Sequence, residues 1–165
     1  METFFNNKDS AKESSMKFLP TLVFAFLFVS FSSAYGFNFE QYKQGDLDQL
    51  LTVPKIKSGV KMVVPQQIHF RAVLAGPVQN CSTDILKRTM IMQGNKQEVV
   101  DKMALTKCLN IRSAKGAAIS VFIEDKVAER LSREVNPGEV IDLFCTYLYI
   151  TPTGPTLLVN EYKKL

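Results

Sequence analysis

The stretch VFIEDKVAERLSREVNPGEVIDLF, residues 121–144, places one short helical pattern between two strand patterns. Apolar side chains recur there at the spacing of a single helix face: Val127, Ala128, Leu131 and Val135. Asp125 stands where a carboxylate accepts from the free backbone N–H groups of a first turn, so we expect it to cap the helix. Residues 136–138, Asn-Pro-Gly, predict a sharp stop. The segment therefore predicts one helix between two strands.

Strands are predicted on both sides of this helix. Before it, residues 67–76, 106–113 and 117–124 alternate apolar and polar side chains, which is typical of half-buried strands. After it, residues 139–150 predict a long strand that is apolar on both of its faces. Residues 156–162 predict a further strand that returns along the sheet. The second apolar face of 139–150 has two explanations, closure of a barrel or a surface left for a partner.

Residues 82–105 separate the first two predicted strands. Val99, Val100 and Met103 have helical spacing, and Asn95 followed by Glu98 resembles a capping box. A hairpin that turns at residues 94–95 is the alternative. We interpret the segment as a helical insertion.

The order of these elements is strand, insertion, strand, strand, helix, strand and strand. This order resembles the OB-fold, and the chain looks like a small exported bacterial protein of that kind. The resemblance covers about residues 64–162 and rests on pattern and order. It implies an all-β or α+β domain over residues 66–165, which includes the insertion at residues 82–105. That domain would be a five-stranded Greek-key barrel with one helix between its third and fourth strands. A generic α+β sandwich is the alternative.

Residues 16–36, MKFLPTLVFAFLFVSFSSAYG, have the layout of a secretory signal peptide. Lys17 supplies a positive start, and Phe18–Phe31 is an apolar run. Ala34 and Gly36 then give the small-x-small pattern of a cleavage site. The run is shorter than the ~20 residues that a membrane helix needs, so we expect cleavage rather than an uncleaved anchor. The prediction is a periplasmic or secreted protein with no stable membrane span.

Two segments flank the predicted signal. Residues 1–15 are polar and acidic, whereas a signal peptide needs a positive lead-in. We interpret them as an over-extended reading frame, with a disordered tail as the alternative. Residues 37–65 predict an N-terminal arm or edge strand, because Pro54 and Pro65 would interrupt a central strand.

The chain has three cysteines, and an exported protein meets an oxidising compartment. Cys81 follows the first strand and Cys108 begins the second. If these strands pair antiparallel, as the OB-fold resemblance implies, the two positions lie close together, so a disulfide between them is predicted. Cys145 stands among apolar residues and is expected to be a buried, unreactive thiol.

The sequence contains few groups that suggest catalysis or metal binding. His69 is the single histidine, and no Cys, Asp or Glu cluster with metal-ligand spacing accompanies it. No motif for a nucleophile, a phosphate-binding loop or a dinucleotide is present. We therefore expect no enzyme activity, no metal and no cofactor. The net charge of +4 is spread along the chain, which does not favour a nucleic-acid partner.

Binding is what the resemblance to the OB-fold implies. In that fold the outer face of the second and third strands carries the ligand, together with adjoining loops. In this sequence the face would present Arg71, Asn110, Arg112, Ser120 and Phe122. Phe144, on the second face of its strand, would be left for a partner. The expected function is a non-catalytic adaptor that binds a protein of the cell envelope. Binding of a glycan or a small molecule to the same face is the alternative.

Overall fold

The structure, a computed structural model, describes residues 36–165. The predicted signal peptide and the segment before it lie outside the described residues, apart from Gly36. In the described range, no helix is both long enough and apolar enough to cross a bilayer.

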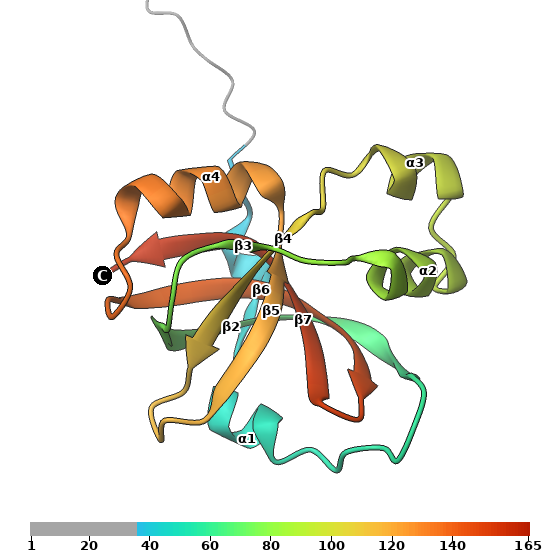
Figure 1. The fold of residues 1–165 in the computed structure, drawn as a ribbon, viewed down its shortest axis with the longest axis horizontal. Coiled ribbons are helices and arrows are strands. Elements are labelled where there is room, and N and C mark those ends of the chain that lie inside the picture. Colours follow the sequence, from blue (N-terminus) through green and yellow to red (C-terminus); the bar gives the residue numbers. More distant parts are fainter. Residues whose placement is uncertain (1–35) are drawn as a thin grey trace, which may run out of the picture. The chain divides into compact units, whose positions relative to one another are not determined.

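The described residues form a mixed α+β fold with a seven-stranded sheet and four α-helices (Figure 1). The strands are β1 Lys43–Gln44, β2 Lys61–Leu74, β3 Gln79–Asn80, β4 Lys107–Arg112, β5 Ala118–Ile123, β6 Val140–Thr151 and β7 Gly154–Lys164. The helices are α1 Leu47–Leu51, α2 Asp84–Met92, α3 Gln97–Lys102 and α4 Asp125–Glu134, with a 3-10 turn, η1, at Phe39–Gln41.

Five of the strands follow one another around a ring. The sheet order is β1-β2-β6-β7-β5-β4-β3, and β4 also pairs with β2. That last contact is short, because it joins only Val73 to Arg112 and Leu74 to Ile111. The sheet is therefore ring-like without being a regular barrel. The sequence order of strands and helix that we predicted is present, with β1 and β3 as additional two-residue strands.

Alternation places the predicted core residues inside the ring. Ile68, Phe70, Ala72 and Leu74 of β2 are all buried, as their period of two predicts. Leu109 and Ile111 of β4 and Val121 and Ile123 of β5 join the same core. The apolar stripe of α4 is buried against it, also as predicted. Burial of one face thus fixed the parity of each strand.

The predicted cap of α4 is wrong. Asp125 is the first helical residue, and no side chain caps the helix. The Asp125 carboxylate instead accepts from Thr106, at 2.7 Å from the backbone N–H and 2.9 Å from the hydroxyl. These bonds tie the start of α4 to the start of β4.

The insertion is helical, as predicted, and not a hairpin. Helices α2 and α3 fill it, and Gly94, at φ 94°, ends the turn between them. The predicted capping box is wrong, because Lys96 is the N-cap residue of α3 and no side chain caps that helix. The Asn95 amide donates to the carbonyl oxygen of Met90, at 2.8 Å. Asn95 therefore satisfies the end of α2 and not the start of α3.

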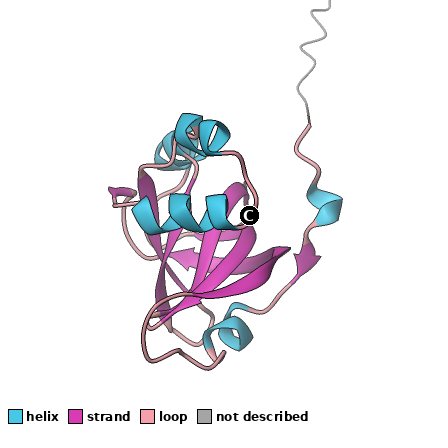
Figure 2. Cartoon of the chain, turned by 90° about the vertical axis from the view of Figure 1, so that its right-hand side faces the viewer, coloured by secondary structure: helices cyan, strands magenta, loops and turns pink. Residues whose placement is uncertain are grey.

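Both faces of β6 are covered within the chain. Leu143 and Cys145 point into the ring core. Leu148 packs against α2 and α3 in a second apolar cluster, together with Leu86 and Leu158. Phe144 is covered by the N-terminal arm, which Figure 2 shows running along one side of the sheet. The second apolar face of β6 is therefore accounted for by the insertion and the arm.

Candidate binding groove

A cavity of about 660 Å³ opens beside β5. Its walls come from β5, from the start of the insertion and from the hairpin between β6 and β7, and Leu51 and Lys55 of the arm also line it. We call it the β5 groove, defined by Cys81, Ile85, Ser120, Phe122, Tyr149 and Pro155. Figure 1 shows the β6–β7 hairpin diverging from β5 at this place.

The groove exists because β5 is paired unequally on its two edges. Six consecutive residues of β5, Ala118–Ile123, pair with β4. On the other edge, pairing with β7 is confined to Phe122 and Ile123. From Ser120 back to Ala117 the two strands separate, and the cavity fills the space between them.

The groove has an apolar floor and a polar rim. Tyr149 is 1% exposed and forms part of the floor, where burial raises the pKa of its hydroxyl. Ile85 of α2 is 57% exposed at the mouth. Hydroxyls of Ser120 and Thr153 line the rim. A ligand with apolar side groups and a hydrogen-bonding backbone would match such walls.

The sequence-predicted face is partly brought together at this groove. Ser120 and Phe122 line it. Asn110 pairs directly with Ser120, and Arg112 pairs with Ala118, so both lie on the same outer face of the sheet. Arg71 stands apart from the groove, where its guanidinium forms an ion pair with Asp142 at 3.2 Å.

Phe144 is not available as a contact surface in this structure. It is 5% exposed and lies in an aromatic cluster with the arm. Its ring centroid is 4.7 Å from Phe39, 5.6 Å from Tyr42 and 5.2 Å from His69. The Lys163 ammonium lies 3.9 Å from the centroid of the Phe39 ring and adds a cation–π contact. The cluster fastens the arm to the outside of β6.

Two cysteines meet at the inner end of the groove. Cys81 and Cys108 both line it, and their thiols are in hydrogen-bonding contact. The two cysteines lie 2.6 Å apart, and no disulfide bond joins them in this structure. The predicted disulfide therefore stays a prediction. Burial, with a smaller contribution from Cys108, raises the pKa of the Cys81 thiol to about 12. A thiol that stays protonated at neutral pH is a weak nucleophile. Cys145 is fully buried, and burial raises the pKa of its thiol as well.

Sequence reasoning missed the groove residues that lie outside the predicted binding face. Ile85 and Tyr149 line the groove, as does Lys55 of the arm. Alternation indicates which way a side chain points, but it does not indicate which loop lies next to which strand. No signal in the sequence singled out Ile85, because another apolar residue of the same helix, Met92, is also exposed.

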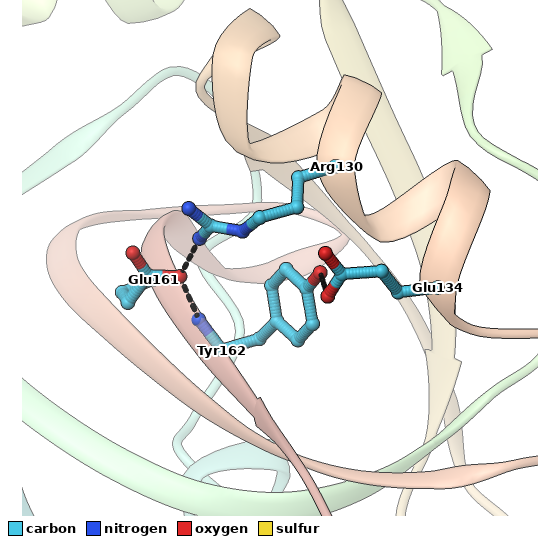
Figure 3. A network of polar contacts seen from close by, with 4 residues as sticks. All are labelled: Arg130, Glu134, Glu161 and Tyr162. Atoms are coloured by element: carbon cyan, nitrogen blue, oxygen red, sulfur yellow. Dashed lines mark hydrogen bonds and ion pairs between the residues drawn. The ribbon is translucent and has the colours of Figure 1, made fainter.

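A separate polar network holds α4 on β7 (Figure 3). Arg130 forms an ion pair with Glu161, and the Tyr162 hydroxyl donates to Glu134 at 2.5 Å. The Arg130 guanidinium also lies 5.1 Å from the centroid of the Tyr162 ring. Burial and Glu134 raise the pKa of Tyr162 to about 12. Each contact joins the helix to the strand, so the arrangement fits a structural role.

Within residues 36–165, no group of three or more His, Cys, Asp or Glu side chains is placed to hold a metal ion. No protein-family model matches the sequence, and no curated protein matches it significantly.

Proposed function

We propose that this chain is an exported, non-catalytic binding protein whose partner, a protein of the cell envelope, occupies the β5 groove. One observation carries the proposal. The groove brings together a partly unpaired strand, an exposed isoleucine and two of the five residues that the sequence predicted as a binding face.

The arrangement of the strands supports an OB-like fold for the ring. Going around it, β2, β4, β5, β7 and β6 are neighbours in that order, and β6 returns to β2. The helix α4 stands between β5 and β6, the third and fourth of these strands along the chain. In OB-folds the working surface lies on the second and third strands and their adjoining loops. The β5 groove includes residues of β5, the third of these strands, which supports the comparison.

The chemistry of the groove favours binding over catalysis. Its ionisable side chains are those of Lys55, Cys81, Cys108 and Tyr149. The pKa values of Cys81 and Tyr149 are raised, so both groups keep their protons at neutral pH. Groups in that state donate hydrogen bonds to a ligand and do not act as bases.

A small molecule or a glycan is the second candidate ligand. A cavity of about 660 Å³ lies within the range of small-molecule sites, roughly 300–1,000 Å³. The aromatic ring of Phe122 at its wall would suit a sugar ring.

Site-specific photo-cross-linking distinguishes these candidates. A photoreactive side chain replaces Ile85 in the full-length chain, which is expressed in the cells that produce it. The matched control carries the same group at Arg133, an exposed position on α4 outside the groove. A protein partner predicts one adduct of defined mass at position 85 that is absent at 133. Mass spectrometry then identifies the adduct.

Two results would contradict the envelope-partner proposal. Equal adducts at both positions would show nonspecific labelling and no site at the groove. A small adduct at position 85 with no protein attached would indicate that the groove binds a small molecule or a glycan and not a protein.

A further inference from the structure

The edge of β5 that faces the groove carries free backbone groups. The Glu124 N–H donates to the carbonyl oxygen of Val159, at 3.3 Å. The backbone N–H of Glu124 therefore faces β7, and so should those of every second residue before it. Alternate residues of a strand direct their N–H and C=O groups to the same side, so those of Ser120 and Ala118 face the same way. These two residues lie beyond the last pair with β7 and therefore open onto the groove.

Strand β7 does not continue along this edge, for a local reason. Pro155 has no N–H and cannot extend the ladder. The hairpin there is closed on β6 instead, with Ile150 paired to Pro155 and Thr151 paired to Gly154. The edge of β5 is thus left open by the chemistry of its own neighbour.

A second open edge in the described residues has a different character. Along residues 61–67, β2 pairs with β6 on one side, through residues 61, 62, 66 and 67, and has no neighbouring strand on the other. This edge carries Lys61 and Pro65, and a β-bulge lies between Met62 and Gln66. Charged residues, prolines and bulges are the features that protect an edge from another strand. The β5 edge has Ala117, Ala118 and Ser120, which are small and uncharged.

The charges beside the β5 edge are positive. Lys55 is the charged residue that lines the groove, and no carboxylate lines it. Arg112, the partner of Ala118, and Lys115, in the turn before β5, are both exposed at the same end of the strand. An incoming segment with acidic side chains would complement these three cations.

We propose that the β5 groove binds an extended, acidic segment of a partner polypeptide, which adds to the sheet as a strand hydrogen-bonded to Ala118 and Ser120. A polypeptide backbone presents N–H and C=O groups at the same spacing as the free groups of β5. Alternate side chains of the segment then contact Ile85 and Phe122 on the outer side. The inference rests on the proposed function and specifies the chemistry of its partner.

Amide hydrogen exchange measured by NMR on the full chain tests the inference directly. The probe is the blocked hexapeptide EVEVEV, with KVKVKV as its charge-reversed control. In the free chain we expect the amides of Ala118 and Ser120 to exchange rapidly and that of Val121 to be protected. Millimolar EVEVEV should slow exchange at Ala118 and Ser120 by at least about tenfold, because exchange requires an open hydrogen bond. KVKVKV should leave both rates unchanged, and added salt should weaken the effect of EVEVEV.

A matched pair of variants separates backbone recognition from side-chain recognition. Ser120→Pro removes the N–H that faces the groove, whereas Ser120→Ala removes the hydroxyl and keeps the N–H. We expect EVEVEV to lose its effect on Ala118 in Ser120→Pro and to keep it in Ser120→Ala. A cooperative thermal transition in Ser120→Pro verifies that the variant is folded.

Slow exchange at Ala118 and Ser120 in the free chain would show that the edge is already paired and would overturn the inference. The inference would also be overturned if saturating EVEVEV left the exchange rates of Ala118 and Ser120 unchanged. It would be overturned as well if EVEVEV slowed exchange at Ala118 equally in Ser120→Pro and Ser120→Ala. The cross-link at position 85 tells the two levels apart. If the adduct persists in Ser120→Pro, the partner binds without strand addition, and only the proposed function stands. If no adduct forms at all, both the strand-addition inference and the proposed function are contradicted.

Discussion

The contact between Cys81 and Cys108 follows from the pairing of two short segments. Gln79 pairs with Cys108, and the Cys81 N–H donates to the carbonyl oxygen of Thr106 at 3.0 Å. Cys81 is therefore two residues beyond the partner of Cys108 and points to the same face. Burial is the main reason that the pKa of Cys81 is raised, and the contact with Cys108 adds a smaller effect.

We predict that these two thiols form a disulfide when the chain is exposed to glutathione disulfide. Each oxidation transfers two electrons and two protons from the cysteine pair and yields two glutathione thiols. Closing this loop should raise the free energy of unfolding by roughly 3–4 kcal/mol on the chain-entropy estimate. Denaturant unfolding with and without reductant measures the gain.

Cys81→Ser is the control, because it should unfold at the same denaturant concentration under both conditions. The raised pKa also predicts slow oxidation at neutral pH and faster oxidation as the pH rises, since the thiolate is the reactive form. A wild-type chain that remains a mixed disulfide with glutathione would contradict the prediction.

At the scale of the element, α4 depends on polar contacts as well as on its apolar stripe. Tyr162 is buried at 6% exposure, and its hydroxyl donates to Glu134 of the helix. The folded chain therefore holds the proton of Tyr162 more tightly than the unfolded chain does, with a pKa of about 12 against the ordinary 10.0. The stabilisation from this bond is complete below the unfolded pKa and is lost as the pH rises through the folded pKa.

The prediction is that the loss of stability between about pH 10 and pH 12 is smaller in Tyr162→Phe than in the wild type, because the other groups with raised pKa values, such as Tyr149 and Cys81, contribute equally to both proteins. At pH 7 the phenylalanine variant should be about 1 kcal/mol less stable, because it lacks one hydrogen bond and leaves Glu134 to water. Urea unfolding at a series of pH values measures both curves. Parallel curves for the two proteins across this pH range would contradict the assignment.

The elements themselves were predictable to different degrees. Strand parity and the α4 stripe came from local periodicity, because one buried face dictates every second or every third to fourth side chain. The caps were predicted wrongly at Asp125 and Asn95, since Asp125 accepts from Thr106, which is distant in the chain, and Asn95 donates back to Met90 of the preceding helix. The cover of Phe144 was not predicted, because it comes from Phe39 and the rest of the arm, which are far from Phe144 in the chain.

At the scale of the molecule, the groove lies between two apolar clusters. The ring core holds the strands and α4 together, and the second cluster holds α2 and α3 against β6 and β7. Phe122 packs against the second cluster, and Val121, next to it, belongs to the ring core. The groove could not be predicted from the sequence, because it depends on how the insertion is placed against β5. Ser120 and Phe122 were found because they belong to a single strand.

Two neighbouring residues of α2 test whether folding and binding use different faces of the insertion. Leu86 is 0% exposed in the second cluster, whereas Ile85 is 57% exposed at the groove. Leu86→Ala should lower the free energy of unfolding by about 2–5 kcal/mol, because it opens a cavity in packed surroundings. Ile85→Ala should change it by no more than about 0.5 kcal/mol, because the side chain is already in water.

In peptide binding we expect the reverse, with the larger effect in Ile85→Ala and the smaller effect in Leu86→Ala. Ile85→Ala is expected to weaken the effect of EVEVEV on exchange at Ala118 and Ser120, since the peptide loses an apolar contact. Leu86→Ala, measured where it is still folded, should keep the effect, because Leu86 lies beneath the helix and does not line the groove. If both variants lose stability and binding together, the insertion acts as one cooperative unit, and its exposed face is not a separate binding surface. If Ile85→Ala alone loses binding at full stability, the exposed isoleucine is retained for contact with a partner.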